Sequence, residues 1–353
     1  MSPNFSDNTN MDTIDFKKFS EQLRSELLRV NGWRKVVRTG RIAVYLFVFC
    51  WFMFVLFGGA LVSYIGLENY MQFTKYIIPV FIGFIVVNFV FTRCMTNFQE
   101  RESEAMQHIM STLFPTVYFS ASSQVDSRIL RDSKLFSASF SDPALAANTY
   151  GYIQFPHGEH SLHVADIGVS YGLLNKLQYN PVLGYFVMIY RFVLRPLVAS
   201  RLDSSPHNVR GMFAWCKIDK RFKGNIIILP DHLEQKIGYL AKNIQGLKKR
   251  YSARLLQLED QEFENYFAVY ADDEVEARML LTPAMMRHMT ALHQTFGCDI
   301  MLSFSRGTFY YAAVMPSGFL CVRPRALNDG KLLEDIYNDI SLSCKVAEEL
   351  RLN

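Results

Sequence analysis

Two long hydrophobic runs without charged residues stand out near the N-terminus of this chain. They cover residues 42–67 and 76–92, and neither contains Asp, Glu, Lys or Arg. As α-helices they would be about 39 Å and about 26 Å long, compared with about 30 Å for the hydrocarbon core of a bilayer. Lys75 precedes the shorter run and can reach the interface with its flexible side chain, which lengthens the usable span. The pattern therefore predicts two transmembrane helices, joined by a short external loop at residues 68–75.

Basic residues on either side of these runs predict how the helices cross the membrane. Those nearest to the start of the first run or to the end of the second are Arg29, Arg34, Lys35, Arg38, Arg41, Arg93 and Arg101. The only basic residue of the loop is Lys75. Because Lys and Arg are enriched on cytoplasmic flanks, residues 1–41 and 93–353 are both predicted to be cytoplasmic.

Residues 1–41 are predicted to be a polar segment that contains one amphipathic helix. From Asp12 to Val30, hydrophobic residues recur at the spacing of an α-helix, with charged residues between them. The sequence leaves three partners open for this hydrophobic face. The helix can lie on the lipid surface with Trp33 and Arg34 at the headgroups, pack on the cytoplasmic domain, or pack on a second copy of the chain.

Beyond the second run the pattern changes to short stretches rich in β-branched and aromatic residues, separated by turn residues. The predicted strands are Tyr150–Phe155, Ser161–Ser170, Val209–Ile218, Asn225–Leu229, Tyr266–Tyr270, Ile300–Phe304, Thr308–Met315 and Phe319–Val322. The predicted helices are 98–110, which prolongs the second run, 231–244, 275–296 with a restart at Thr282 and Pro283, and 332–350. Strands in succession with helices between them predict an α+β fold, with a mixed, mostly antiparallel sheet in a cytoplasmic domain of residues 93–353.

The segment from Val182 to Val198 is unusually hydrophobic for such a domain. Its only charged residues are Arg191 and Arg195. Two arginines and a proline make a poor membrane-spanning helix, because each central Arg costs roughly 2.5–3.5 kcal/mol on insertion. Three interpretations stay open: a helix in the core, a contact with a partner, or an interfacial helix that places both arginines at lipid phosphates.

Composition narrows the classes of function. The net charge of +4 argues against a nucleic-acid-binding protein, whose surface would be strongly basic. The six cysteines are scattered without C-x-x-C spacing, which argues against a zinc or thioredoxin-like site. The glycine-rich nucleotide-binding motifs and the H-E-x-x-H and G-x-S-x-G motifs are also missing. We therefore expect no cofactor and no nucleic-acid partner.

Carboxylates are concentrated in one segment near the predicted restart at Pro283. The candidate functional residues there are Asp272, Asp273, Glu274, Glu276 and Arg278. Such a cluster can hold a divalent cation or transfer protons. The alternative is structural: Asp272 or Asp273 caps a helix, the glutamates occupy its first turn, and Arg278 pairs with a neighbouring carboxylate. The structural interpretation is favoured, and no catalytic residue is assigned.

Four residues of the predicted hairpin, His157, Glu159, His160 and His163, are of types that bind metals. In a β-hairpin the first two fall in the turn, and the side chains at positions 160 and 163 point to opposite faces of the sheet. The spacing favours a solvated hairpin, and no metal site is assigned.

Three blocks of this sequence resemble the signature blocks of an uncharacterised bacterial membrane-protein family, a domain of unknown function. They are GMFAWCKIDKRFKGNIIILPD at 211–231, LEDQEF at 258–263 and FAVYADDEVEARMLLTPAMM at 267–286, and residues 346–353 resemble its C-terminal block. The resemblance implies two N-terminal transmembrane helices in the bacterial inner membrane, with both termini cytoplasmic. It brings no catalytic residues to this chain. It also implies a membrane complex, in which LemA-type membrane proteins are one class of partner.

The sequence thus favours a membrane-anchored α+β protein that works as an interaction or scaffold protein rather than as an enzyme. Two alternatives stay open: an enzyme at the membrane surface with an unidentified reaction, and an accessory subunit of a transport or envelope-stress complex. The expected partners are the lipid bilayer and other membrane proteins, including copies of this chain.

Overall fold

The computed structural model describes most of the chain, and its residues divide into two compact units. The described ranges are 16–65, 70–115, 117–136, 146–157, 160–170, 177, 180, 183–184, 187, 209–218, 224–230, 254–315, 318–320, 332–338 and 340. One unit consists of residues 17–106 with 324–330, and the other of residues 1–16, 107–323 and 331–353. We call the second unit the sheet domain.

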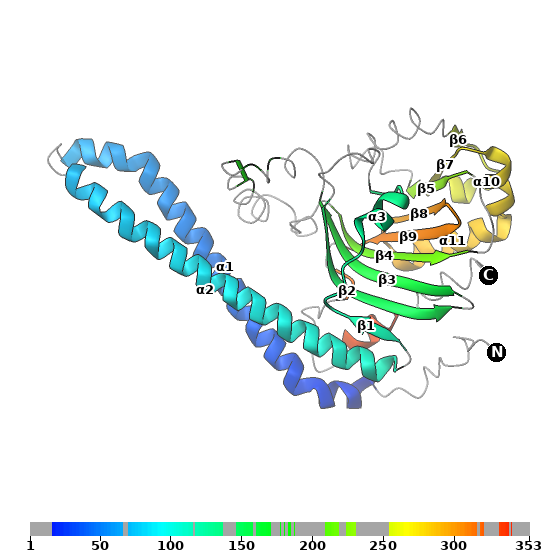
Figure 1. Ribbon diagram of the computed structural model, residues 1–353, viewed down its shortest axis with the longest axis horizontal. Coiled ribbons are helices and arrows are strands. Elements are labelled where there is room, and N and C mark those ends of the chain that lie inside the picture. Colours follow the sequence, from blue (N-terminus) through cyan, green and yellow to red (C-terminus); the bar gives the residue numbers. More distant parts are fainter. Residues whose placement is uncertain are drawn as a thin grey trace. The chain divides into compact units, whose positions relative to one another are not determined.

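Two long helices form an antiparallel hairpin, drawn in blue and cyan in Figure 1. They are α1 (Phe16–Ile65) and α2 (Tyr70–Leu113). Arg34 lies 3.7 Å from Glu102, and its guanidinium lies 5.9 Å from the centre of the Phe98 ring. Further along, a Cβ atom on Gly40 would come within 3.0 Å of the Phe91 ring. These contacts show that α1 and α2 run in opposite directions along each other.

Both helices of the hairpin are longer than the hydrophobic runs predicted to span the membrane. Within the described residues 16–65, the amphipathic segment and the first hydrophobic run form one continuous helix, and α2 continues through residues 98–110 as predicted. Residues 70–75, assigned to the loop, are helical instead, because they contain neither Pro nor Gly to interrupt the helix. Leu23, Leu27 and Val30 are each only 1% exposed. The protein itself therefore covers this face, which favours packing on protein among the three partners that the sequence left open.

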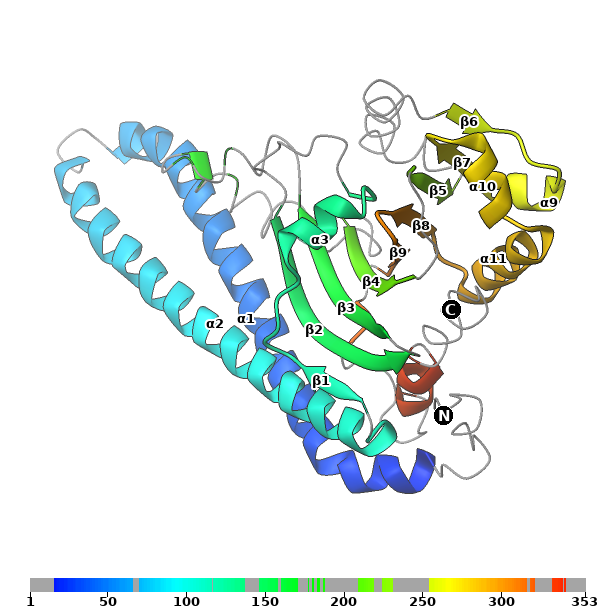
Figure 2. The same ribbon diagram turned by 45° about the vertical axis from the view of Figure 1, so that its right-hand side comes forward.

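The sheet domain is built on nine strands in the order β1-β2-β3-β4-β9-β8-β5-β7-β6. Their bounds are β1 Tyr118–Ser120, β2 Ala146–His157, β3 His160–Ser170, β4 Val209–Lys217, β5 Ile226–Pro230, β6 Arg254–Leu256, β7 Phe267–Ala271, β8 Ile300–Ser305 and β9 Thr308–Val314. Every neighbouring pair is antiparallel. Figure 2 shows β2, β3 and β4 as the longest arrows of the sheet. The α+β prediction is confirmed.

Seven of the predicted strands are present, with ends that differ by a few residues. The eighth prediction, Phe319–Val322, is wrong at Phe319 and Leu320, which form a bend. Their backbone N–H groups are bonded to a buried carboxylate instead of a neighbouring strand. The short strands β1 and β6 and the short helix α3 (Ser127–Asp132) were missed, because three to six residues carry too little periodicity to be recognised.

The predicted helices agree with the structure wherever it describes them. Residues 332–338 are helical, whereas 231–244 and 341–350 lie outside the described residues. The predicted segment 275–296 forms α10 (Glu274–Leu280) and α11 (Pro283–Phe296), with the restart at Pro283 as expected.

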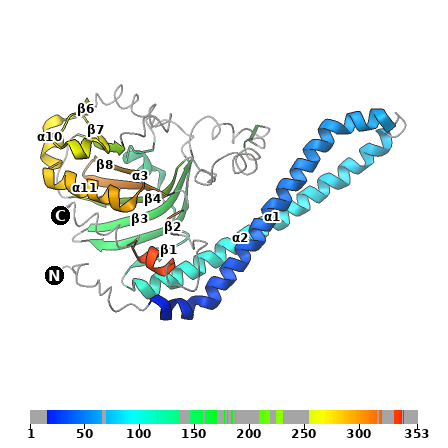
Figure 3. The ribbon, with the colours of Figure 1, turned by 180° about the vertical axis from the view of Figure 1, so that it is seen from behind.

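Helices cover both faces of the sheet. On one face, Leu130 of α3 and the following Phe136 are buried with Phe213 of β4 and Tyr270 of β7 in one hydrophobic cluster. On the other face, α9 (Gln261–Glu264) and α11 pack against β7. There the Phe267 ring contacts the rings of Phe263 and His293, at 5.1 Å and 5.6 Å between centres. Figure 3, seen from behind, shows α11 in front of the strands.

Candidate functional site

Asp273, one of the candidate residues of the acidic motif, is the N-cap of α10. Its Oδ1 accepts hydrogen bonds from the backbone N–H groups of Val275 at 2.8 Å and Glu276 at 3.2 Å. These groups have no partner within the helix, so the carboxylate satisfies them and its charge faces the positive end of the helix dipole. The structural interpretation is confirmed for Asp273, and the helix begins one residue before the predicted Val275.

The neighbouring carboxylates tie this turn to the start of β5. Asp272 accepts hydrogen bonds through Oδ2 from the backbone N–H, at 3.1 Å, and the side-chain amide of Asn225. Glu276 accepts one from the Gly224 backbone N–H at 3.0 Å. The Asn225 side-chain oxygen in turn accepts a hydrogen bond from the Ser305 hydroxyl at 2.8 Å. Two carboxylates of the motif therefore hold three separate parts of the sheet domain together.

Arg278 completes the motif as the predicted ion-pair partner. Its guanidinium lies 3.0 Å from Glu274 one turn earlier and donates a further hydrogen bond to the Gln257 carbonyl at 3.0 Å. Thr282 caps the next helix by accepting from the Met285 N–H at 3.3 Å, with Pro283 following it. Among the described residues, no three His, Cys, Asp or Glu side chains converge as metal ligands would. Each candidate residue of the motif thus has a structural contact.

The cap predicts a modest and specific loss of stability. Replacing Asp273 with alanine leaves two N–H groups of α10 without an acceptor and should lower the free energy of unfolding by about 1 kcal/mol. Asp273→Asn keeps a side-chain oxygen at the same place and should lose no more than a few tenths of that. Urea unfolding followed by circular dichroism measures both. Equal losses in the two variants would contradict the capping role.

Lys134 is a buried cation that sequence analysis missed. It follows α3, has a left-handed backbone (φ 59°) and is only 8% exposed. Burial lowers its pKa from 10.5 to about 8, while the negative charges of Asp272 and Asp132 raise it and that of Arg306 lowers it. No local pattern marks such a residue, because two of the charges around it, those of Asp272 and Arg306, belong to residues far away in the chain.

Lys134 predicts how stability depends on pH. The folded protein releases the proton near pH 8 and the unfolded chain near 10.5, so stability should rise as pH increases between these values. From pH 7 to pH 10 the gain should be about 2 kcal/mol. In Lys134→Met this pH-dependent gain in the free energy of unfolding should be missing. The free energies of unfolding of both proteins are measured by urea denaturation at each pH. The difference between them removes the contribution of the other titrating groups. A difference between the two proteins that does not change with pH would contradict the shift.

The histidines predicted on the hairpin are separated by the structure. His163 lies on β3, where its ring stacks on Trp215 with 5.0 Å between centres and an interplanar angle of 13°. Its Nδ1 shares a 2.6 Å hydrogen bond with the Tyr152 hydroxyl. Burial lowers the pKa of His163 and so favours the neutral ring. His163 therefore belongs to an aromatic row across β2, β3 and β4, whereas His157 and His160 pair with each other at the hairpin end.

A second buried charge, Asp166 of β3, is also invisible in the sequence. Its Oδ2 lies 2.9 Å from Arg210 Nη2 and accepts hydrogen bonds from the Phe319 and Leu320 N–H groups at 3.2 Å and 3.3 Å. The Arg210 guanidinium also lies over the Tyr150 ring, 3.7 Å from its centre. Burial raises the pKa of Asp166, and its Arg210 and N–H partners offset part of that rise. This cluster fastens the bend at 318–320 onto the sheet.

The surface of the hairpin is the remaining candidate for function. Within the described residues, no helix combines the length and the apolar character that crossing a bilayer requires. Membrane crossing by residues 42–67 and 76–92 therefore stays a prediction. Both helices nevertheless expose large hydrophobic side chains, which we call the apolar band: Ile42, Leu46 and Phe49 on α1, and Ile82, Val86, Phe89 and Val90 on α2. Each of these residues is more than half exposed.

The segment 182–198 can be assessed at only three positions. Leu183, Gly184 and Val187 are described, and Val187 is buried. Arg191 and Arg195, the predicted membrane-interface residues, lie outside the described residues, so the interfacial interpretation stays a prediction.

Comparison with known proteins identifies one domain. Residues 207–352 match the model of a family described as "Protein of unknown function (DUF3137)". The blocks at 211–231 and 267–286 that carry the sequence resemblance lie inside this range, and the hairpin lies outside it. Searches of the curated proteins and of the solved structures found no significant match. The matched domain begins just before β4 and includes the acidic motif, but it brings no assigned activity.

Proposed function

We propose that the α1–α2 hairpin anchors this protein in a membrane and that the sheet domain works there as an interaction or scaffold module rather than as an enzyme. The observation that carries the proposal is the apolar band. Its residues recur at intervals of three and four on α1 and of one to four on α2. Leaving so many large side chains in water is unfavourable by roughly 25 cal/mol for every Å² of apolar surface. Lipid chains would remove this cost.

The sequence on both sides of the band supports the same arrangement. The runs 42–67 and 76–92 contain no charged residue, and the basic residues gather at one end of the hairpin. This bias favours a cytoplasmic sheet domain with both termini in the cytoplasm, in the inner membrane of a bacterium. Partners would then be the bilayer and other membrane proteins, either of the LemA type or copies of this chain.

The contacts of the acidic motif favour a scaffold over an enzyme. Asp273 caps a helix, Asp272 and Glu276 bind backbone N–H groups, and Arg278 pairs with Glu274. A catalytic carboxylate acts on a substrate, whereas each of these carboxylates binds a backbone N–H group or a side chain of the protein itself.

Alkaline carbonate extraction of membranes that contain the full-length protein tests the anchor. The wild type should stay with the membrane pellet and float with lipid in a density gradient. The double variant Leu46→Arg/Val86→Arg places two charges in the band, and each would cost roughly 2.5–3.5 kcal/mol inside a bilayer, so much of it should be extracted. Leu28→Arg/Val36→Arg is the matched control, because these residues are also exposed on α1 but lie before the band.

Extraction of the wild type by carbonate would overturn the anchor. Reporter fusions at position 10, at position 353 and near Asn69 test the orientation independently. The first two should report the cytoplasm and the third the exterior. A C-terminal reporter outside the cytoplasm would contradict the orientation inferred from charge.

A further inference from the structure

Three arginines lie at one level of the hairpin, directly beside the apolar band. They are Arg38 and Arg41 on α1 and Arg93 on α2, and we call them the arginine collar. The contact between Gly40 and the Phe91 ring shows which parts of the two helices are level. With a rise of 1.5 Å per residue, each collar arginine is within about 3 Å of this level along the helix axis.

The band begins where the collar ends. Ile42 follows Arg41 on α1, and Val90 and Phe89 lie three and four residues before Arg93 on α2. The Arg93 guanidinium lies 5.7 Å from the centre of the Phe89 ring, so one side chain of the collar contacts the edge of the band. All three arginines are exposed. Positive side chains therefore lie directly beside apolar ones on the hairpin surface. This arrangement is complementary to an amphiphile, in which an anionic head group is attached to a hydrocarbon chain.

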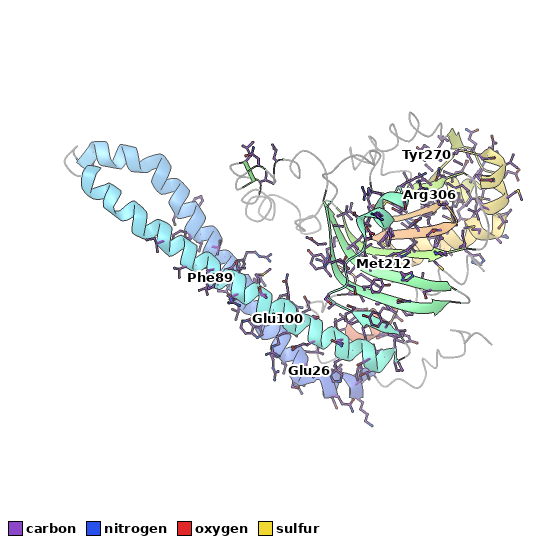
Figure 4. All side chains as sticks on the ribbon, in the orientation of Figure 1. Glu26, Phe89, Glu100, Met212, Tyr270 and Arg306 are labelled. Atoms are coloured by element: carbon purple, nitrogen blue, oxygen red, sulfur yellow. The ribbon has the colours of Figure 1, made fainter. Side chains whose placement is uncertain are left out.

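Carboxylates do not neutralise the collar within the helices. The nearest acidic residues in the two sequences are Glu26 and Glu100, about 18 Å from Arg38 and about 10 Å from Arg93 along the helix axes. Two ion pairs of the hairpin, Arg34 with Glu102 and Arg101 with Glu104, lie along the helices on the side of the collar away from the band. In Figure 4 the labelled Phe89 and Glu100 lie at clearly separate levels of α2.

We propose that the arginine collar binds the phosphates of anionic phospholipids, so that the hairpin selects these lipids from the leaflet it contacts. This rests on the proposed membrane anchor and adds the class of lipid. The planar guanidinium fork donates two parallel hydrogen bonds to a phosphate, and the lipid chains would cover the adjacent Ile42, Phe89 and Val90. A lipid fits better than an acidic protein, because positive charges from both helices lie at one level and border an apolar surface.

Lipid selectivity of the reconstituted full-length protein tests this proposal. The protein is placed in phosphatidylcholine vesicles that contain a trace of spin-labelled phosphatidylglycerol or spin-labelled phosphatidylcholine. The fraction of label that the protein restricts in motion is measured by electron paramagnetic resonance. The wild type should prefer phosphatidylglycerol by about five-fold for each arginine that a headgroup contacts. High salt should weaken the preference.

The triple variant Arg38→Gln/Arg41→Gln/Arg93→Gln should lose the preference and restrict both labels equally. A control variant, Arg128→Gln/Lys217→Gln/Arg287→Gln, removes three exposed charges from the sheet domain and should keep it. Circular dichroism checks that both variants retain their helices. The collar is ruled out if the wild type restricts both lipids equally or if the control loses as much preference as the triple variant. A protein that restricts neither lipid would overturn the membrane anchor itself.

Discussion

Replacing Asp166 with alanine is expected to lower the free energy of unfolding of the sheet domain by about 3–5 kcal/mol. Asp166 is completely buried and holds both Arg210 and the 318–320 bend. Removing its carboxylate leaves the Arg210 charge, which is only 16% exposed, without its counter-charge, and leaves two buried N–H groups without an acceptor. Breaking such a pair costs far more than the pair itself contributes, because the remaining charge stays out of water.

Asp132→Ala is the matched control for this loss. Asp132 also pairs with an arginine, Arg306, at 3.1 Å, but the two side chains are 41% and 76% exposed. Water replaces the lost partner there, so the cost should be within about 1 kcal/mol. Guanidinium unfolding of both variants, followed by tryptophan fluorescence, measures the difference. A loss for Asp166→Ala that is no larger than the control's would show that the buried pair does not hold the bend.

Gly211→Ala should have the second large effect, a loss of several kcal/mol or a failure to fold. Gly211 lies in β4, has φ 156°, and a Cβ atom there would be 2.0 Å from the Ala313 carbonyl oxygen and 2.5 Å from the Met315 N–H nitrogen. Both are backbone atoms, one in β9 and one in the residue that follows it, so no side chain can move aside. The β4–β9 pairing would have to separate at its end.

Gly297→Ala is the control that distinguishes the steric clash at position 211 from the cost of placing alanine in a backbone conformation that favours glycine. Gly297 ends α11 in the left-handed region, at φ 58°, and an added Cβ atom there would meet nothing within 4 Å. Only the backbone penalty remains, about 1 kcal/mol. Thermal unfolding of the two variants should therefore show a much lower Tm for Gly211→Ala. Similar melting temperatures would mean that the sheet relaxes around position 211.

The features that agree best with prediction are those that depend on neighbouring residues. The cap at Asp273, the cap at Thr282 and the restart at Pro283 each involve groups two or three residues apart, so the short pattern contains all that is needed. Seven of the strands likewise follow from short runs of β-branched and aromatic residues, and β5 and β8 are buried at every position, as in a sheet that is covered on both faces.

The groups that were missed are joined across long distances in the chain. Asp166 meets Arg210 across 44 residues and the Phe319 N–H across 153, and Asp272 meets Asn225 across 47. No pattern in one sequence specifies which polar residues will meet, because that depends on strand order. The order β4-β9-β8-β5-β7 brings β5 between β7 and β8 and lets Asn225 contact both Asp272 and Ser305.

By itself, the sequence determined the α+β class, most of the strands, the helix caps and the level at which charge gives way to an uncharged surface on the hairpin. These follow from local periodicity and local charge, which are properties of short segments. Tertiary structure alone decided that Lys134 and Asp166 are buried, that the acidic motif is a structural tie, and that Arg38, Arg41 and Arg93 share one level. Each depends on two segments that meet only after the chain has folded, because burial and register belong to pairs of elements and not to either one alone.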